Sequence, residues 1–119
     1  MKYLCLGYHE DKAWKAMSDN ERKALLEECA AYDDILRKKG NYIDGKALQG
    51  AQTAITLRFE NGRVSITDGP FAETKEQLGG VMVLEARDLN HAIQLMSQSP
   101  CMRVGGCLEI RPINEEITS

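Results

Sequence analysis

The residues most capable of chemistry are concentrated at positions 68–80, DGPFAETKEQLGG. An Asp-Gly-Pro turn begins this stretch, because Gly tolerates positive φ and Pro fixes its own φ. A polar segment with two glutamates and one lysine follows, and a glycine pair then leads into the apolar run 81–84. Carboxylates, a lysine and a histidine at the end of an apolar sheet could transfer protons without a cofactor. A solvated connection between two strands is the alternative interpretation.

Three titratable residues are the candidate catalytic groups: Asp68, His9 and Asp33. Asp68 begins the motif, His9 lies near the end of the first expected strand, and Asp33 lies on a helix beside apolar positions. The candidate ligand-binding residues all belong to the motif: Gly69, Pro70, Phe71, Glu73 and Lys75. We expect no metal and no cofactor, because the sequence has no metal-ligand spacing and no nucleotide-binding or hydrolase motif.

A β-hairpin should position Asp68. Residues 53–59 alternate between apolar and polar types, and Asn61-Gly62 is typical of a two-residue hairpin turn. That turn fixes the register and places Ile55 opposite Asp68. The carboxylate therefore falls on the apolar face of the hairpin, at its open end. There it is either hydrogen-bonded to the amides of the following turn or available for proton transfer.

Apolar periodicity predicts the remaining elements. We expect strands at residues 2–8, 42–48, 81–85 and 107–111, and helices at 19–39 and 89–98. Ser18 and Glu21 have the spacing of a capping box at the start of the long helix. Both faces of the first strand are apolar, which is typical of a central strand.

This order of elements predicts one domain over residues 1–119, with a ferredoxin-like α+β fold. It is a split βαβ arrangement with an extra β-hairpin. One antiparallel sheet should have two helices on one face. The other face still carries apolar side chains, so we expect a second copy to cover it in a two-fold homodimer, as in a dimeric α+β barrel.

The motif at 68–80 resembles the signature of DGPF-domain proteins, a branch of the YCII-related family. The resemblance extends more loosely to the opening strand, KYLCL, and to the closing EIRP at 109–112. It implies the same dimeric ferredoxin-like fold. The wider family includes a chloromuconolactone dehalogenase, and other members have a His–Asp pair as their proposed centre. Here the first long helix carries Asp33 and Asp34 but no histidine, so the resemblance does not carry that pair over.

Composition excludes some classes of partner. A net charge of −3 provides no electrostatic footprint for nucleic acid or for an anionic membrane. No segment has the length and apolarity of a transmembrane helix, and the N-terminus lacks the apolar run of a signal peptide. We therefore expect a cytoplasmic protein with a small organic ligand as its other partner.

The four cysteines are expected to be free thiols: Cys5, Cys29, Cys101 and Cys107. They show no Cys-x-x-Cys pair, and a reducing compartment keeps thiols reduced.

Two functions fit these residues, and the sequence does not decide between them. One is a cofactor-free enzyme that performs acid–base chemistry on a small organic acid or lactone. The other is a non-enzymatic small-molecule sensor or regulatory partner, because DGPF-domain proteins resemble partners of extracytoplasmic-function sigma factors. The charged segment 73–77 suits an active-site rim and a docking surface equally well.

Overall fold

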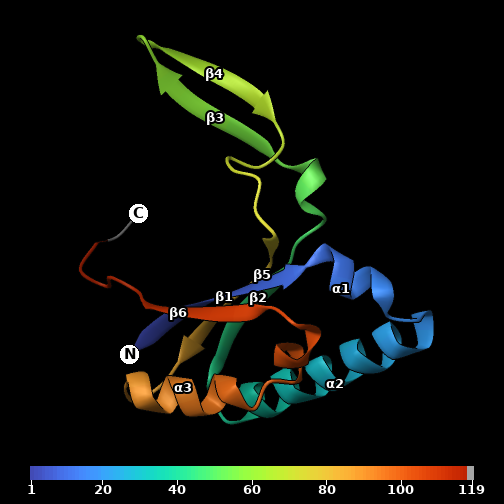
Figure 1. The fold of residues 1–119 in the computed structure, drawn as a ribbon. Helices are drawn as coiled ribbons and strands as arrows, with labels where there is room; N and C mark the ends of the chain where they lie inside the picture. Colours follow the sequence, from blue (N-terminus) through green and yellow to red (C-terminus); the bar gives the residue numbers. More distant parts are fainter. Residues whose placement is uncertain (118–119) are drawn as a thin grey trace.

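In the computed structural model, which describes residues 1–117, the chain forms a four-stranded sheet, a separate two-stranded sheet and three α-helices (Figure 1). The strands of the larger sheet are β1 (Lys2–Glu10), β2 (Tyr42–Ala47), β5 (Glu76–Glu85) and β6 (Cys107–Pro112). The helices are α1 (Asp11–Ala16), α2 (Asp19–Lys38) and α3 (Leu89–Ser97). Two short 3-10 helices, η1 (Ala51–Thr53) and η2 (Pro100–Val104), lie in connections.

The larger sheet is antiparallel throughout and has the order β2-β5-β1-β6. β1 is central: Tyr3 lies opposite Leu84 of β5 and opposite Pro112 of β6. α2 lies between β1 and β2 in the chain, and α3 lies between β5 and β6. This is the ferredoxin-like split βαβ order, and the predicted α+β fold class is confirmed.

Side-chain caps begin the two longer helices. The Ser18 hydroxyl accepts a hydrogen bond from the Glu21 N–H, and the Glu21 carboxylate accepts one from the Ser18 N–H, so the predicted capping box forms. α2 ends at Lys38, one residue earlier than expected. At the start of α3 the Asp88 carboxylate accepts from the His91 N–H at 2.8 Å. Both caps satisfy amide donors that a helix start leaves unpaired.

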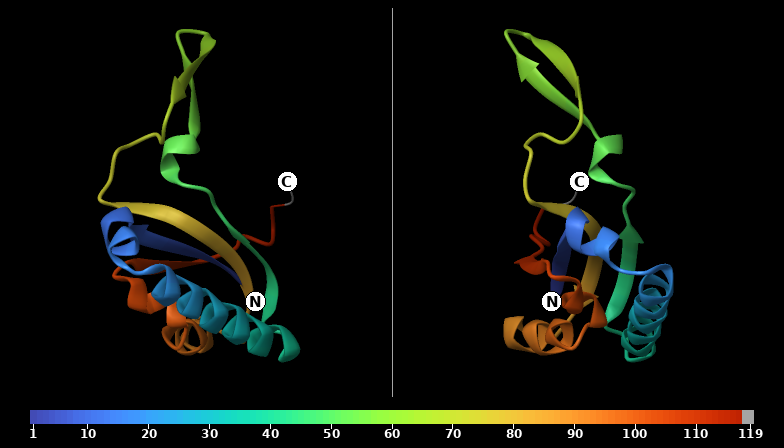
Figure 2. Two further views of the ribbon diagram at one scale, coloured as in Figure 1. Left: turned by 90° about the vertical axis from the view of Figure 1, so that its right-hand side faces the viewer. Right: turned by 45° about the vertical axis from the view of Figure 1, so that its right-hand side comes forward.

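α2 and α3 cover one face of the larger sheet (Figures 1 and 2). Leu36 of α2 and Met96 of α3 pack with Tyr3 and Leu84 of the sheet in one buried core. Four other apolar residues of these helices are exposed instead: Leu26 and Ile35 of α2, and Leu89 and Ile93 of α3. The sheet touches only the nearer side of each helix, so these four residues remain outside the core.

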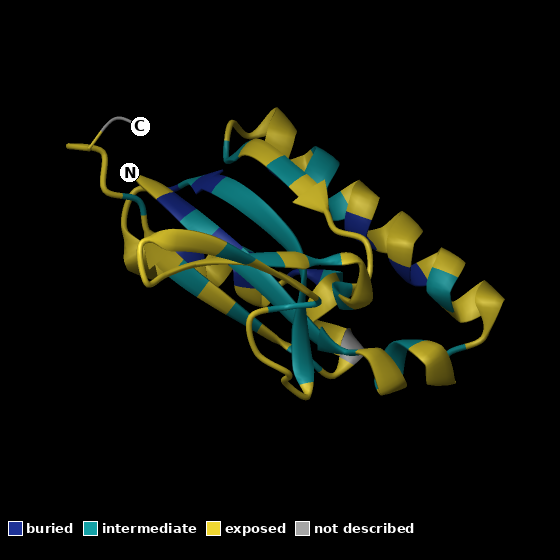
Figure 3. Ribbon diagram, turned by 90° about the horizontal axis from the view of Figure 1, so that it is seen from above, coloured by how far each residue is buried: buried dark blue, intermediate teal, exposed yellow. Residues whose placement is uncertain are grey.

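The opposite face of the larger sheet, which we call the open face, has no α-helix over it within residues 1–117, and only the short helix η1 lies on this side, near the base of the hairpin at 55–68 (Figures 1 and 3). Successive side chains of a strand point to opposite faces, and Tyr3 and Cys5 of β1 are buried in the core. The apolar residues that alternate or pair with them on the open face are Leu4, Leu6, Tyr8, Val81 and Val83. Each of these is only partly buried.

The hairpin at residues 55–68, here called the arm, forms the second sheet from β3 (Ile55–Glu60) and β4 (Arg63–Asp68). Its predicted register is confirmed, with Phe59 opposite Val64 and Ile55 opposite Asp68. The arm stands away from the larger sheet, on the side of the open face (Figures 1 and 2). The expectation of a single sheet is therefore wrong. Residues 48–54 connect the hairpin to β2 and residues 69–75 connect it to β5, and the hairpin strands pair with neither of them.

β5 begins at Glu76, five residues before its expected start at Val81. β1 likewise continues to Glu10, so that Glu10 lies opposite Glu76 and His9 lies opposite Gln77. Polar residues extend both strands here because each provides the other with a hydrogen-bonding neighbour. The charged connection is accordingly shorter than the sequence indicates.

Cys29 of α2 and Cys101 of η2 form a disulfide, with their Cα atoms 6.0 Å apart and a sequence separation of 72. Cys5 is a buried free thiol and Cys107 an exposed one. The expectation of four free thiols is therefore wrong. Their spacing did not reveal the pair, because the packing of η2 on α2 brings the two cysteines together.

Candidate functional site

Asp68 lies at the base of the arm, opposite Ile55, and is exposed. The turn after it is held by Gly69, whose φ is +93°. The Gly69 N–H donates to the Ala54 carbonyl at 2.7 Å, and the Gly69 carbonyl accepts from the Thr56 hydroxyl at 2.7 Å. These bonds close the open end of the hairpin without using the Asp68 carboxylate.

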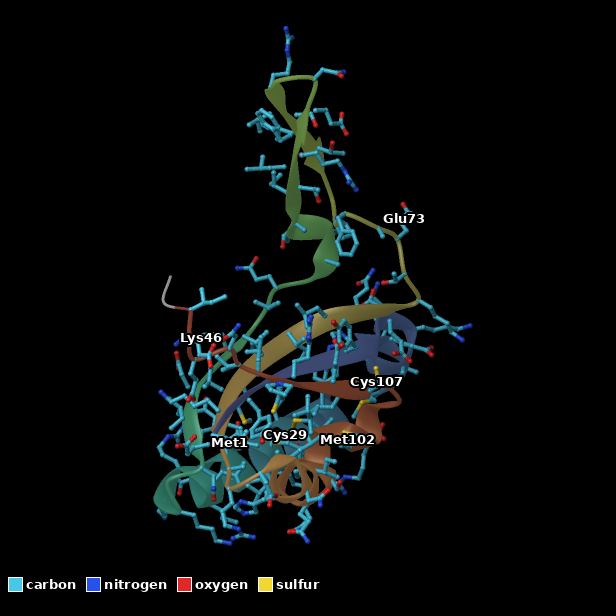
Figure 4. All side chains as sticks on the ribbon, turned by 90° about the vertical axis from the view of Figure 1, so that its left-hand side faces the viewer. Met1, Cys29, Lys46, Glu73, Met102 and Cys107 are labelled. Carbon is cyan, nitrogen blue, oxygen red and sulfur yellow. A yellow bond between two sulfur atoms is a disulfide. The ribbon has the colours of Figure 1, made fainter. Side chains whose placement is uncertain are left out.

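The rest of the motif connects the arm to β5. Pro70 is partly buried, whereas the Phe71 side chain is 78% exposed. Glu73 is exposed and points outward from this connection (Figure 4). Lys75 turns back toward the larger sheet, where its Nζ lies 3.6 Å from Oε1 of Glu10 at the end of β1. Lys75 thus links the motif to the sheet.

Asp33 lies on α2 and is partly buried. Burial raises the pKa of its carboxyl, and the nearby charge of Arg37 opposes that change. Asp34 behaves differently: it pairs with Lys38 at 3.0 Å and Arg37 at 3.5 Å, and the hydrogen bond from Lys38 is the main reason that its pKa is lowered. Because α2 covers the helical face of the sheet, Asp33 is separated from the arm by the sheet (Figure 1).

His9 lies near the end of β1 and is partly buried. Its imidazole lies over Gly79, since a Cβ at that glycine would come within 2.5 Å of both Cε1 and Nδ1 of the ring. The strand pairing shifts between Gly7 and Tyr8, which leaves Gly79 as the extra residue of a bulge. Bulges redirect side chains and are frequent beside active sites. The bulge and the bare glycine together position the imidazole.

Four further polar residues meet at this end of the sheet. The Tyr8 hydroxyl donates to Oε1 of Glu109 at 3.3 Å. The Cys107 thiol donates to Oε2 of Glu76 at 3.1 Å, and Figure 4 places Cys107 at the sheet edge below the connection to the arm. Tyr8 lies opposite Cys107 across β1 and β6. We call Tyr8, Glu76, Cys107 and Glu109 the sheet-end cluster. His9 follows Tyr8 on β1, so its side chain lies at the same end of the sheet but on the opposite face.

The two hydrogen-bond donors of the cluster stay protonated at neutral pH. Partial burial, followed by the charge and hydrogen bond of Glu109, raises the pKa of the Tyr8 phenol. The hydrogen bond to Glu76, with desolvation and the charges of Glu76 and Glu109, raises the pKa of the Cys107 thiol. Cys107 is therefore not a thiolate nucleophile. Neutral donors beside carboxylates can hydrogen-bond to a small polar ligand and exchange protons with it instead.

The three predicted catalytic residues lie in different parts of the molecule. Asp68 is on the arm, Asp33 is on the helical side of the sheet, and His9 is at the sheet end. His9 lies at the same end of the sheet as the sheet-end cluster, and Lys75 reaches that end through its ion pair with Glu10.

The members of the sheet-end cluster were not identified from the sequence. Alternation along the first strand could have placed Tyr8 on the open face beside Leu6. Glu76 and Cys107 meet because β1 pairs with β5 on one side and with β6 on the other. A single sequence does not reveal that pairing.

Neither a metal centre nor a membrane span is found in the described residues. No group of three or more His, Cys, Asp or Glu side chains in 1–117 could hold a metal ion. No helix over the same residues is long and apolar enough to cross a membrane. The surface hollows beside Trp14 and Pro112 are lined by residues outside the sheet-end cluster.

Comparison with known proteins places the chain in a family. The YCII-related domain matches residues 1–117. The uncharacterized protein R00369 of Rhizobium meliloti (strain 1021) is 30% identical over 117 residues, covering 95% of this chain and 92% of that protein. The fold is also similar to that of 5-chloro-2-hydroxyhydroquinone dehydrochlorinase (TftG) from Burkholderia phenoliruptrix AC1100, solved in complex with 2,5-dihydroxybenzoquinone. The TM-score is 0.59 with 15% identity, over 96% of this chain and 94% of that one. This chain belongs to the YCII-related family.

Proposed function

We propose that this protein is a homodimer of the DGPF branch and an enzyme for cofactor-free acid–base chemistry on a small organic acid or lactone. The observation that carries the proposal is the sheet-end cluster, in which a phenol, a thiol and two carboxylates meet beside the apolar side chains of the open face, with the His9 imidazole at the same end of the sheet. Such a set can move protons without a metal or an organic cofactor.

His9 is the residue proposed to transfer the proton, because imidazole readily accepts and donates protons near neutral pH. The Tyr8 and Cys107 donors orient the carboxylates of Glu109 and Glu76. These carboxylates are placed to accept hydrogen bonds from substrate hydroxyl groups. Arg111 provides positive charge for an acid substrate nearby. It lies close enough to Tyr8 for its charge to oppose the rise in the pKa of the phenol.

A site of this kind requires a cover. In one chain the cluster borders the open face, whose apolar side chains are only partly buried. A second copy packed on that face would exclude water from the cluster and would strengthen the electrostatic interactions within it. The homodimer is therefore part of the proposed function.

The structural neighbour supports the proposed size of the ligand. TftG is a dehydrochlorinase, and its complex holds 2,5-dihydroxybenzoquinone, a small oxygen-bearing ring. A ligand of similar size suits a site formed by side chains at the end of a four-stranded sheet.

The experiment that tests this function begins with a thermal-shift screen of small carboxylic acids, lactones and hydroxylated ring compounds. A compound that binds the native state raises its melting temperature. Compounds that bind are then assayed for turnover by the wild type, His9→Gln and His91→Gln. His91 is the matched control, because it lies on α3 and its Nδ1 accepts from the Arg87 N–H.

We expect His9→Gln to lose about 100-fold or more in turnover, the scale of a general acid–base group. His91→Gln should retain wild-type turnover. Equal turnover by both variants would remove His9 from the chemistry, and a screen without any turnover would count against an enzyme.

The second candidate function is that of a small-molecule sensor or regulatory partner of an extracytoplasmic-function sigma factor. The exposure of Phe71 and Glu73 on the connection to the arm favours it, because both side chains are available to a docking protein. Calorimetry with such a sigma factor would then show binding that Phe71→Ala weakens and His9→Gln leaves unchanged. An enzyme predicts the reverse pattern for turnover.

A further inference from the structure

The arm displays a continuous apolar surface. Its exposed apolar side chains are Ile55 (59%), Leu57 (63%), Phe59 (76%), Val64 (56%) and Ile66 (71%). The strand pairing places them together, because Leu57 lies opposite Ile66 and Phe59 opposite Val64. The other face of the arm is polar and makes hydrogen bonds, such as that of Thr56 to the Gly69 carbonyl.

An arm of this kind requires something to pack against. A two-stranded hairpin is marginally stable in water by itself, and a contiguous exposed apolar patch marks an interaction surface. Within residues 1–117 the two strands of the arm form a sheet of their own, so the rest of the chain does not extend it. The tip is polar, with Glu60 opposite Arg63, and apolar side chains bordered by polar ones are typical of a protein interface.

The position of the arm indicates what covers it. The arm rises on the side of the open face, from the end of the larger sheet at which β2 stops and β5 starts (Figures 1 and 2). A subunit seated on the open face would therefore lie beside the arm. Sheets that face each other pack about 10 Å apart, whereas a six-residue strand is about 20 Å long. The arm is thus long enough to pass the nearer sheet of that subunit.

We propose that the apolar face of the arm packs on a second copy of this chain, so that each subunit of the dimer clasps the other. Two apolar surfaces on the same side of the molecule, the open face and the arm, are then buried by one two-fold operation. The sheet-end cluster lies at the base of the arm, so the clasp also fixes the partner over the site. This inference rests on the homodimer in the proposed function.

Neighbouring positions on β4 offer a matched test. Ile66 lies on the apolar face and Thr67 on the polar face, and both are exposed in one chain. Sedimentation equilibrium of Ile66→Asp and Thr67→Asp would measure the dimer dissociation constant of each. We expect Ile66→Asp to raise it at least about 30-fold, the effect of losing an interface hot spot. Thr67→Asp should change it less than about 3-fold, as expected for a residue outside the interface.

A measurement on the unmodified protein covers the case in which Ile66→Asp disturbs the arm itself. Hydrogen exchange of residues 55–68 should slow as the protein concentration is raised through the dimer dissociation constant. Exchange of the arm that is independent of concentration would overturn the inference.

A variant of the open face separates the two proposals. Leu6 lies on that face, so Leu6→Asp should disrupt the dimer. If Leu6→Asp disrupts it while Ile66→Asp does not, the clasp is wrong and the proposed dimer stands. If the wild type is a monomer at high micromolar concentration, both proposals fail. In that case an arm that is protected in the monomer would be packed on its own sheet.

Discussion

Substitution of Gly79 by alanine should act directly on the imidazole of His9. The new Cβ would lie 2.5 Å from Cε1 and Nδ1 of the ring, well inside the usual contact distance of about 3.5–4.0 Å. The ring must turn away or the strand must move. Overpacking of this kind costs about 1–3 kcal/mol.

A second effect opposes the first. Alanine in a strand is more favourable than glycine by about 0.5–1 kcal/mol, and Gly79 is not among the glycines with positive φ. Its carbonyl, which accepts from the Leu48 N–H at 2.8 Å, is unchanged by the substitution. In the wild-type background the net result should be a loss of about 0.5–2 kcal/mol. In a His9→Ala background the collision is absent, so Gly79→Ala should stabilise by about 0.5–1 kcal/mol.

Urea unfolding of the four proteins tests this change of sign. The double-mutant cycle should give a coupling of about 1–3 kcal/mol between His9 and Gly79. Gly80→Ala is the control, because a Cβ there would meet the Lys46 carbonyl at 3.3 Å and not the histidine. The effect of Gly80→Ala should therefore be the same with or without His9. An equal effect of Gly79→Ala in both backgrounds would refute the placement of the imidazole over this glycine.

Three other predictions concern residues named in the sequence analysis. Asp68→Asn should change the free energy of unfolding by less than about 0.5 kcal/mol, as for an exposed surface residue. If the carboxylate instead held the turn, urea titration at pH 7 would show a larger loss of unfolding free energy. Asp33→Asn should stabilise the protein at neutral pH but not at pH 3. Burial raises the pKa of the Asp33 carboxyl in the folded protein, so the stability of the wild type falls as the pH rises from the pKa of the unfolded chain through the pKa of the folded protein. Parallel stability–pH profiles of the two proteins would contradict this. Thiol titration of the denatured, unreduced protein should find two thiols. Reduction of Cys29–Cys101 should lower the free energy of unfolding by up to about 4 kcal/mol, because the bond closes a loop with a sequence separation of 72. Four thiols before reduction would rule the bond out.

The elements with strong local signals were predicted well. The capping residues Ser18 and Glu21 begin α2, and the Asn61-Gly62 turn fixes the register of the arm down to Asp68. Each of these features depends on residues that are close in the sequence, so propensity and spacing are sufficient to identify them.

The position of the arm and the membership of the site were not predictable in the same way. The register placed Asp68 on the apolar side of the hairpin, but a register does not say where a hairpin lies relative to the larger sheet. The sheet-end cluster depends on long-range pairing, since Tyr8 and Glu109 are 101 positions apart. The disulfide and the bulge at Gly79 likewise arise from packing and not from local sequence.

The central place of β1 also determines when the domain can assemble. β1 is the first strand to be synthesised, but its neighbours in the sheet are β5 and β6, at Glu76–Glu85 and Cys107–Pro112. Contacts between residues so far apart in the chain slow folding. On the ribosome, where synthesis proceeds at about 5–20 residues per second, β1 must wait for almost the whole chain with its hydrogen-bonding edges and apolar side chains unpaired. The arm, whose strands are joined by a two-residue turn, can form during that interval. A nascent chain that stalls before β6 would therefore expose an unpaired first strand beside a finished apolar hairpin, and this is the stage at which chaperone binding would protect the protein most.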